Sequence, residues 1–298
     1  MSQRQPPNND ELNKVMARLE QEFQQRHQTS GGLPPDEQPV EQVGQGSRQV
    51  LVQIPVARVW LAYLLLAVNV LMFGLTLFVS NTIQLPYQDA VGNVYIDAYT
   101  AALGLLGAKE NTLINAGQWW RLLTPVVLHG DLMHLLFNSW ALFVFGPLVE
   151  RIYGTLRFAV VYVLSGLGSS IASYVFNPEA LSIGASGAIF GLIGTITAYT
   201  YVSRHWAGPD ATKMQLGQMA VLAIINLAIG FAPGSNIDNA GHIGGLITGA
   251  IVGYGFAPRY DLVKHAGQPI LERRDSPLVG WAVAVATLLA LVAFFVWV

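Results

Sequence analysis

The chain has 298 residues, of which 52% are hydrophobic and only 11% are charged. Soluble domains carry about 25% charged residues, so this composition argues against a disordered, nucleic-acid-binding or simple soluble globular protein. The net charge of -2 gives no basic field that would attract nucleic acid or acidic lipid. The absence of cysteine excludes disulfides, thiolate metal sites and cysteine nucleophiles.

Residues 1–50 form a polar N-terminal segment rich in Gln and Pro. Its early acidic residues, Asp10 and Glu11, are untypical of a mitochondrial transit peptide, and it has no apolar core typical of a cleaved signal peptide. Apolar residues at helical spacing predict one short amphipathic helix: Leu12, Met16, Leu19 and Phe23. We expect a cytoplasmic tail with a lone helix, the alternative being a helix that contacts a membrane surface or a partner.

Seven windows contain no Asp, Glu, Lys or Arg and are long enough to cross a bilayer, which takes about 18 residues. They cover residues 59–88, 132–149, 158–178, 180–203, 214–237, 239–258 and 276–298. A helix of a soluble protein usually keeps a charged outer face. The windows therefore predict an all-α polytopic membrane protein with seven transmembrane helices. The sequence shows no convincing internal repeat, which argues against a transporter.

The positive charges alternate between the two sides of the predicted spans. With a cytoplasmic N-terminus, 14 of the 16 Lys and Arg residues lie in cytoplasmic segments, and only Lys109 and Arg121 lie outside. This agrees with the positive-inside rule and places the C-terminus outside. The first helix is expected near 56–79, followed by a long external segment at about 80–128.

Strongly polar side chains within membrane helices are costly and mark a candidate functional site. His134 and Asn138 lie in the second predicted span, Ser186 opens the fourth, and His242 lies near the start of the sixth. All three spans enter from outside, so we expect these side chains at one depth in the outer half of the membrane. Glycines four residues apart predict close approach of the fourth and sixth spans. They are Gly187 and Gly191 in the fourth span and Gly241, Gly245, Gly249 and Gly253 in the sixth.

These residue types suit acyl transfer. Ser186 is the candidate nucleophile and His242 the candidate general base. His134 and Asn138 share one helix face and, with the Ser186 backbone N–H, are candidate donors to an oxyanion. The alternative role for the His134 and Asn138 side chains is hydrogen bonding between helices. Asp238 could contact His242, but a helix cap formed by Asp238 or Asn239 is the simpler interpretation, so we expect a dyad. The histidine spacing predicts no metal site.

The same residues resemble the motifs of the rhomboid family of intramembrane serine proteases. GASGAIFGL at 184–192 looks like the family's serine motif, and AGHIGGLITG at 240–249 resembles its histidine helix. Three further motifs are similar: HxxxxHxxxN in His129, His134 and Asn138, the WR pair in Trp120 and Arg121, and the ER pair in Glu150 and Arg151. The resemblance covers about 56–257 in motif order.

The resemblance implies a six-helix core with a dyad at Ser186 and His242 and oxyanion donors at His134, Asn138 and the Ser186 backbone. It also implies cleavage of peptide bonds in single-span membrane proteins, without metal or cofactor. The seventh helix makes the chain a six-plus-one form. Phe190 departs from members that have Tyr at this position, but Phe can still stack on His242.

We therefore divide the chain into a cytoplasmic tail (1–50), a six-helix rhomboid-like core (51–257), a cytoplasmic linker (258–278) and a seventh transmembrane helix (279–298). The expected function is that of a serine endopeptidase in a bacterial plasma membrane. Its expected partners are the lipid bilayer and single-span membrane substrates, and not nucleic acid. The alternatives are a catalytically inactive rhomboid-like protein that binds membrane proteins, a seven-helix transporter or receptor, and an intramembrane hydrolase of lipids.

Overall fold

The computed structural model divides the chain into two units, Met1–Leu51 and Val52–Val298. It describes residues 57–82, 87–88, 94–95, 97–235, 237–265, 268–274 and 276–298. All of them belong to the second unit, and the predicted helix over Leu12 to Phe23 lies outside the described residues.

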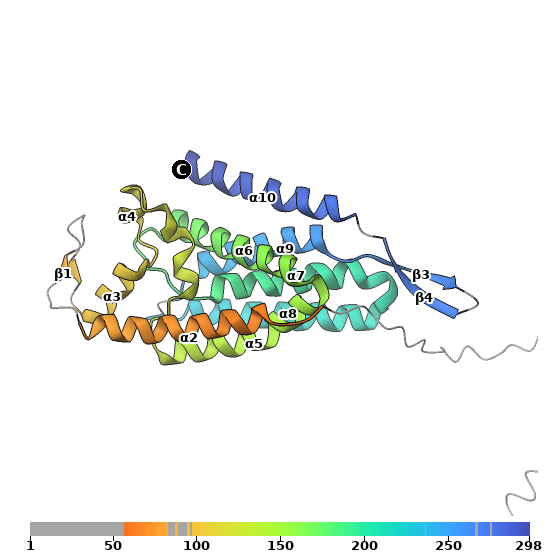
Figure 1. Cartoon of the computed structure of the whole chain (residues 1–298), viewed down its shortest axis with the longest axis horizontal. Helices are drawn as coiled ribbons and strands as arrows, with labels where there is room; N and C mark the ends of the chain where they lie inside the picture. Colours follow the sequence, from red (N-terminus) through yellow and green to blue (C-terminus); the bar gives the residue numbers. More distant parts are fainter. Residues whose placement is uncertain are drawn as a thin grey trace, which may run out of the picture. The chain divides into compact units, whose positions relative to one another are not determined.

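Seven long helices make up most of the described chain (Figure 1). They are α2 (Leu61–Ser80), α5 (Leu132–Tyr153), α6 (Thr155–Phe176), α7 (Ser186–Ala207), α8 (Pro209–Gly230), α9 (Asn239–Phe256) and α10 (Pro277–Trp297). Each occupies most of one charge-free window, so the prediction of helices in these windows is confirmed, with ends that differ by several residues.

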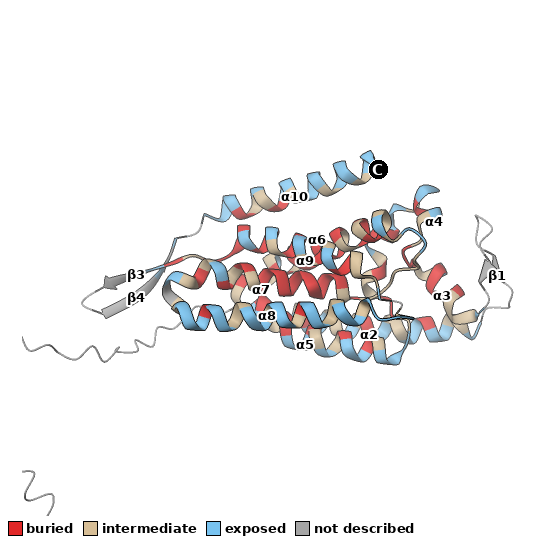
Figure 2. Cartoon of the chain, turned by 180° about the vertical axis from the view of Figure 1, so that it is seen from behind, coloured by how far each residue is buried: buried red, intermediate tan, exposed pale blue. Residues whose placement is uncertain are grey.

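Five of these helices, α2, α5, α6, α8 and α10, are long and apolar enough to cross a membrane. Large apolar side chains such as Leu71 and Phe137 are 70% and 69% exposed, whereas Ser165 and Thr195 are fully buried. This reversal of the soluble pattern fits helices that face lipid. α7 and α9 are less apolar because they are rich in Gly, Ser and Thr. Figure 2 shows that buried residues are concentrated on these two helices and on α6, which packs beside them.

Two neighbouring helix pairs are each joined through one glycine. Gly154 separates α5 from α6, and Gly208 separates α7 from α8. Both have a φ of +85°, a backbone conformation that residues with a Cβ atom rarely adopt. Glycine therefore lets each pair of helices change direction within one residue.

α7 and α9 pack backbone against backbone. A Cβ atom at Gly245 would overlap the carbonyl oxygen of Gly187, and one at Gly249 would overlap that of Gly191. The predicted close approach of these two helices is therefore confirmed. Large apolar residues of α6, α7 and α9 complete the core around this contact, including Phe158, Val161, Leu192, Val252 and Phe256.

The segment between α2 and α5 is folded rather than extended. It contains a two-stranded antiparallel sheet, two short α-helices and two 3-10 helices: β1 (Tyr87–Gln88), β2 (Val94–Tyr95), α3 (Ala98–Leu106), α4 (Asn111–Asn115), η1 (Trp119–Leu122) and η2 (Thr124–Val127). The Asp97 side chain caps α3 by accepting a hydrogen bond from the Thr100 backbone N–H, 2.8 Å away. This bond holds the pKa of Asp97 below its usual value.

The predicted linker at 258–278 also contains regular structure. β3 (Tyr260–His265) and β4 (Gln268–Arg273) form an antiparallel hairpin, in which Tyr260 lies opposite Arg273. The all-α prediction is therefore correct for the core but misses the two hairpins. The alternating pattern of two short strands is too short to distinguish a hairpin from a charged loop.

The Glu150 carboxylate is fully buried near the last turn of α5. It accepts hydrogen bonds from the backbone N–H groups of Trp60, Leu61 and Ala62, at 3.3, 3.1 and 2.9 Å, and from Thr155 Oγ1 at 2.8 Å. Glu150 therefore joins the start of α2 to the junction of α5 and α6. The helix dipole of α2 also favours a negative charge at this place, near the N-terminal end of the helix.

Candidate active site

Ser186 and His242 meet where α7 and α9 begin. Ser186 is the first residue of α7, and His242 lies in the first turn of α9. Ser186 Oγ and His242 Nε2 are 2.8 Å apart, which is hydrogen-bond distance. The glycine contact between the two helices allows this approach, since a side chain at Gly245 would overlap the Gly187 carbonyl oxygen and push the backbones apart.

Asp238 holds the start of α9 in place. Its Oδ1 accepts a hydrogen bond from the Gly241 backbone N–H at 3.1 Å, so the predicted helix cap is confirmed. His242 Nδ1 has no hydrogen-bond partner among the described residues. The pair of Ser186 and His242 therefore has no third member there.

The Phe190 ring covers the imidazole of His242. The two ring centroids are 4.2 Å apart and the planes differ by 9°. The predicted stack is therefore confirmed. Phe190 lies one turn after Ser186 on α7, so one helix supplies both the hydroxyl group and the aromatic surface.

His134 and Asn138 face the pair from α5. Asp131 caps this helix by accepting from the His134 backbone N–H at 2.8 Å. The Gly130 backbone N–H donates a long hydrogen bond to His134 Nδ1, at 3.5 Å, and on this basis we assign the hydrogen of the neutral ring to Nε2. Asn138 Nδ2 is buried without a partner among the described residues. Both side chains thus offer a free N–H donor.

Gly184 shows that the two donors converge. A Cβ atom at this position would lie 2.6 Å from His134 Nε2 and 3.5 Å from Asn138 Nδ2. Gly184 also has a φ of +115°, which favours glycine. The missing side chain therefore leaves open the space into which both donors point, two residues before Ser186.

The four predicted side chains line one cavity of about 740 Å³: His134, Asn138, Ser186 and His242. The first N–H groups of a helix lack partners within that helix, so the Ser186 N–H is a further donor at the start of α7. A hydroxyl next to a base, facing several N–H donors, is equipped for acyl transfer. No cluster of His, Cys, Asp and Glu that could hold a metal occurs in the described part of the chain.

His129, the first residue of the HxxxxHxxxN pattern, lies behind His134 in the structure. It is fully buried, and its ring meets that of His134 edge to face with centroids 5.2 Å apart. The Tyr99 hydroxyl donates to the His129 carbonyl oxygen at 2.7 Å. His129 therefore packs against a cavity residue, and only its spacing from His134 pointed to it in the sequence.

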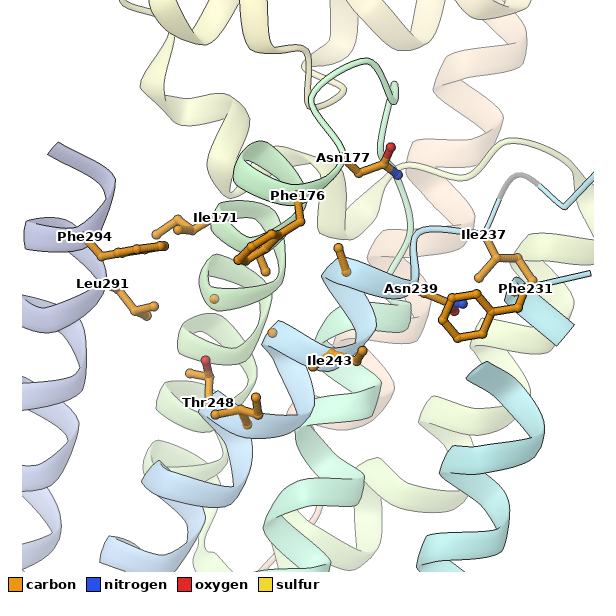
Figure 3. A pocket seen from close by; sticks show the side chains of 16 residues that line it. Ile171, Phe176, Asn177, Phe231, Ile237, Asn239, Ile243, Thr248, Leu291 and Phe294 are labelled. Carbon is orange, nitrogen blue, oxygen red and sulfur yellow. The ribbon is translucent and has the colours of Figure 1, made fainter. Parts of the chain in front are cut away.

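A second cavity, of about 720 Å³, lies among α6, α9, α10 and the connection from α8 to α9. Figure 3 shows its mostly apolar lining, with Ile171 and Phe176 on one side and Leu291 and Phe294 on α10. None of its lining side chains titrates. It lacks the groups that acyl transfer needs, so the cavity with Ser186 is the candidate active site.

Comparison with known proteins identifies relatives of the chain. The Rhomboid domain profile matches residues 116–259. Rhomboid protease GluP of Bacillus subtilis is 51% identical over 154 residues, which cover 50% of this chain but only 28% of GluP. RHOMBOID-like protein 5 of Arabidopsis thaliana is 32% identical over 217 residues, covering 67% of this chain and 69% of that protein.

A second plant relative extends the match along the chain. RHOMBOID-like protein 4 of Arabidopsis thaliana is 28% identical over 271 residues, which cover 86% of this chain and 67% of that protein. The similarity therefore includes the segments that hold His134, Asn138, Ser186 and His242. With its membrane-spanning helices and these matches, the chain is a multi-pass integral membrane protein that belongs to the rhomboid family.

Proposed function

We propose that this rhomboid is an intramembrane serine endopeptidase that hydrolyses peptide bonds in or near the transmembrane segments of single-span membrane proteins. The observation that carries this proposal is the 2.8 Å contact between Ser186 Oγ and His242 Nε2, in a cavity with converging N–H donors. The activity named for Rhomboid protease GluP supports it.

In the first half of the reaction, Ser186 Oγ attacks the carbonyl carbon of the substrate while His242 Nε2 takes the hydroxyl proton. Negative charge develops on the carbonyl oxygen, where His134 Nε2–H, Asn138 Nδ2–H and the Ser186 N–H can donate to it. His242 then passes the proton to the leaving amine as the C–N bond breaks. The product is an ester between the substrate and Ser186.

In the second half, water attacks the ester carbonyl and His242 takes its proton. The C–O bond to Ser186 breaks, and the proton returns to Oγ. No carboxylate among the described residues bonds His242 Nδ1, so the positive imidazole is stabilised differently. The face of Phe190, 4.2 Å away, can do this through a cation–π interaction. None of these steps calls on a cofactor.

α7 and α9 also cross the membrane in this proposal, which gives a six-helix core at 51–257 and an appended seventh helix. Their polar groups bond inward: Thr195 Oγ1 donates to the Gly191 and Gly249 carbonyls, at 2.8 and 2.9 Å. Such internal bonding makes weakly apolar helices compatible with a membrane. The distribution of Lys and Arg supports a cytoplasmic N-terminus and an external C-terminus. The similarity to GluP of Bacillus subtilis supports a bacterial plasma membrane location.

The substrate is expected to unwind before it is cut. A transmembrane helix keeps its peptide bonds in internal hydrogen bonds, and hydrocarbon offers no replacement for them. Good substrates therefore carry Gly or Pro near the cleaved bond, because these residues weaken the helix. Equal cleavage of a Leu-rich helix would contradict this part of the proposal.

The test is cleavage of a fluorescent single-span substrate in liposomes by the wild type and by Ser186→Ala, His242→Ala and Ser203→Ala. Ser203 is the control, because it is a buried serine near the other end of α7 that donates to the Thr200 carbonyl. We expect the wild type and Ser203→Ala to cleave. The other two should lose activity by roughly 10⁴-fold or more while staying folded.

Three other results would overturn the proposal. Cleavage by Ser186→Ala would exclude the mechanism. No cleavage by the wild type across a panel of permissive substrates would favour a rhomboid-like binding protein. Release of fatty acid from the liposomes, instead of peptide cleavage, would identify a lipid hydrolase with the same pair of residues.

A further inference from the structure

Lys109 is a buried cation in the segment between α3 and α4. Its side chain is fully buried, and its Nζ donates to three backbone carbonyl oxygens: those of Asn177 at 2.9 Å, Ala180 at 3.2 Å and Ser173 at 3.3 Å. These carbonyls lie at and just after the C-terminal end of α6, where the helix dipole favours a positive charge. Lys109 therefore holds both the end of α6 and the chain that follows it.

The backbone of Lys109 holds the same connection at a second point. The Lys109 N–H donates to the Ser182 carbonyl at 3.0 Å, and the Ser182 N–H donates to the Lys109 carbonyl at 3.1 Å. Ser182 is four residues before Ser186. The Gly184 N–H, between them, donates to the Pro125 carbonyl at 2.9 Å. The chain that leads to the nucleophile is thus fixed by side-chain and backbone bonds from Lys109 and by the backbone bond to Pro125.

Ser182 connects this chain to the helix of His242. Its hydroxyl donates to Asp238 Oδ2 at 2.8 Å, while Asp238 Oδ1 accepts from the Gly241 N–H at the start of α9. One carboxylate therefore touches the segment before Ser186 and caps the helix that carries His242. Lys109 and Asp238 also attract each other electrostatically.

We propose that Lys109, Ser182 and Asp238 are positioning residues that set the placement of Ser186 relative to His242. This proposal rests on the proposed function above. Ser182 and Asp238 line the active-site cavity, but no hydrogen bond joins any of the three residues to Ser186 Oγ or His242 Nε2. They act through the segment before α7 and the first turn of α9. A displacement of about 1 Å between reacting groups can cost about 10²-fold in rate, so small changes in this network should be visible in catalysis.

The mildest test is Ser182→Ala, which removes the bond to Asp238 and little volume. The matched control is Thr155→Val, which removes a hydroxyl bond of the same 2.8 Å length to Glu150. Ser182→Thr keeps a hydroxyl and serves as the conservative variant. For each, kcat and KM are measured on a single-span substrate in liposomes, together with the rate at which a fluorophosphonate labels Ser186.

We expect Ser182→Ala to lower kcat and the labelling rate about tenfold, with KM changed by less than about twofold. Thr155→Val should leave kcat per folded molecule unchanged, and Ser182→Thr should restore it. A merely structural role would lower the amount of folded protein without changing these rates. If kcat and labelling in Ser182→Ala equal those of Thr155→Val, the positioning proposal is wrong.

Lys109→Met tests the other end of the network, with an expected loss of about 10²-fold in kcat. The double variant with Ser182→Ala should lose less than the product of the two single effects, because both act on one segment. Independent effects would contradict the proposal. If Lys109→Met does not fold, the Ser182 variants decide.

Failure of this proposal can be told apart from failure of the proposed function. Cleavage by the wild type and its loss in Ser186→Ala establish the function, whatever Ser182→Ala does. If the wild type cleaves no peptide, the labelling rate of Ser186 still measures positioning. A wild-type Ser186 that is not labelled at all would overturn the positioning proposal as well.

Discussion

The two ends of α5 treat buried polar groups in opposite ways. Near its last turn, Glu150 accepts four hydrogen bonds from α2 and Thr155. Near its first turns, the cavity contains Asn138 Nδ2 and His242 Nδ1 without partners among the described residues. An unpaired buried polar group costs about 1–3 kcal/mol. The bonded carboxylate of Glu150 thus holds helices together, whereas Asn138 and His242 line a cavity in which a substrate or water can reach their unpaired atoms.

The largest effect on this comparison is expected from Asn138→Ala. Removing one oxyanion donor should lower kcat by about 10²–10³-fold. The thermal midpoint should stay the same or rise slightly, because an unpaired buried amide is lost. Kinetics in liposomes and thermal unfolding in detergent measure the two quantities. A lower midpoint with normal kcat per folded molecule would instead mean that Asn138 bonds between helices.

Glu150→Gln should show the reverse pattern. Glutamine replaces one acceptor oxygen with an N–H donor, which then faces donors from the start of α2. We expect a loss of about 1–3 kcal/mol in the free energy of unfolding and no change in kcat per folded molecule. Denaturant unfolding and kinetics on the folded fraction test this. A large fall in kcat of the folded variant would show that the two ends are not independent.

Phe190→Leu should have a smaller effect on catalysis. It removes the aromatic face above His242, and cation–π interactions contribute about 0.5–2 kcal/mol. This corresponds to a loss of roughly two- to thirtyfold in kcat, while Phe190→Tyr should keep nearly full activity. Steady-state kinetics of both variants measure it. Equal rates for Leu, Tyr and Phe would mean that the ring only fills space.

The smallest effect concerns the acid sensitivity of Asp97, far along the chain from Glu150. The hydrogen bond from Thr100 lowers the pKa of Asp97 in the folded state, so the unfolded state binds the proton more tightly. Its stabilising contribution is present above the usual carboxyl pKa and is lost as the pH falls through the lowered value. Asp97→Asn keeps an acceptor without this titration. The midpoint difference between wild type and variant should therefore shrink from pH 7 to pH 3, and a constant difference would contradict the assignment.

The sequence was most informative where one helix carries its own signal. The charge-free windows predicted the seven long helices, and glycine spacing predicted the close contact of α7 with α9. Polar residues in apolar windows led to His134, Asn138, Ser186 and His242, which line one cavity. Their catalytic roles remain predictions. The cap formed by Asp238 followed from its place just before an apolar run.

Features that depend on distant partners could not be predicted. Lys109 counted only as one positive charge outside the membrane, yet its three acceptors lie more than 60 residues further along the chain. Nothing in its neighbours predicts complete burial. The satisfied state of Glu150 likewise depends on the start of α2, about 90 residues away. The hairpin of β3 and β4 was missed because two short strands give little periodic signal.

The backbone contact between α7 and α9 has a consequence for the entropy of the reaction. Where the glycine backbones touch, no side-chain rotamers separate the two helices, and the side chains of Ser186 and His242 meet at the start of this contact. The conformational freedom of the reacting groups is therefore lost once, when the helices pack during folding. This freedom need not be lost again in each turnover. Thermal motion of flexible side chains therefore has little influence on how often the two groups are at reacting distance.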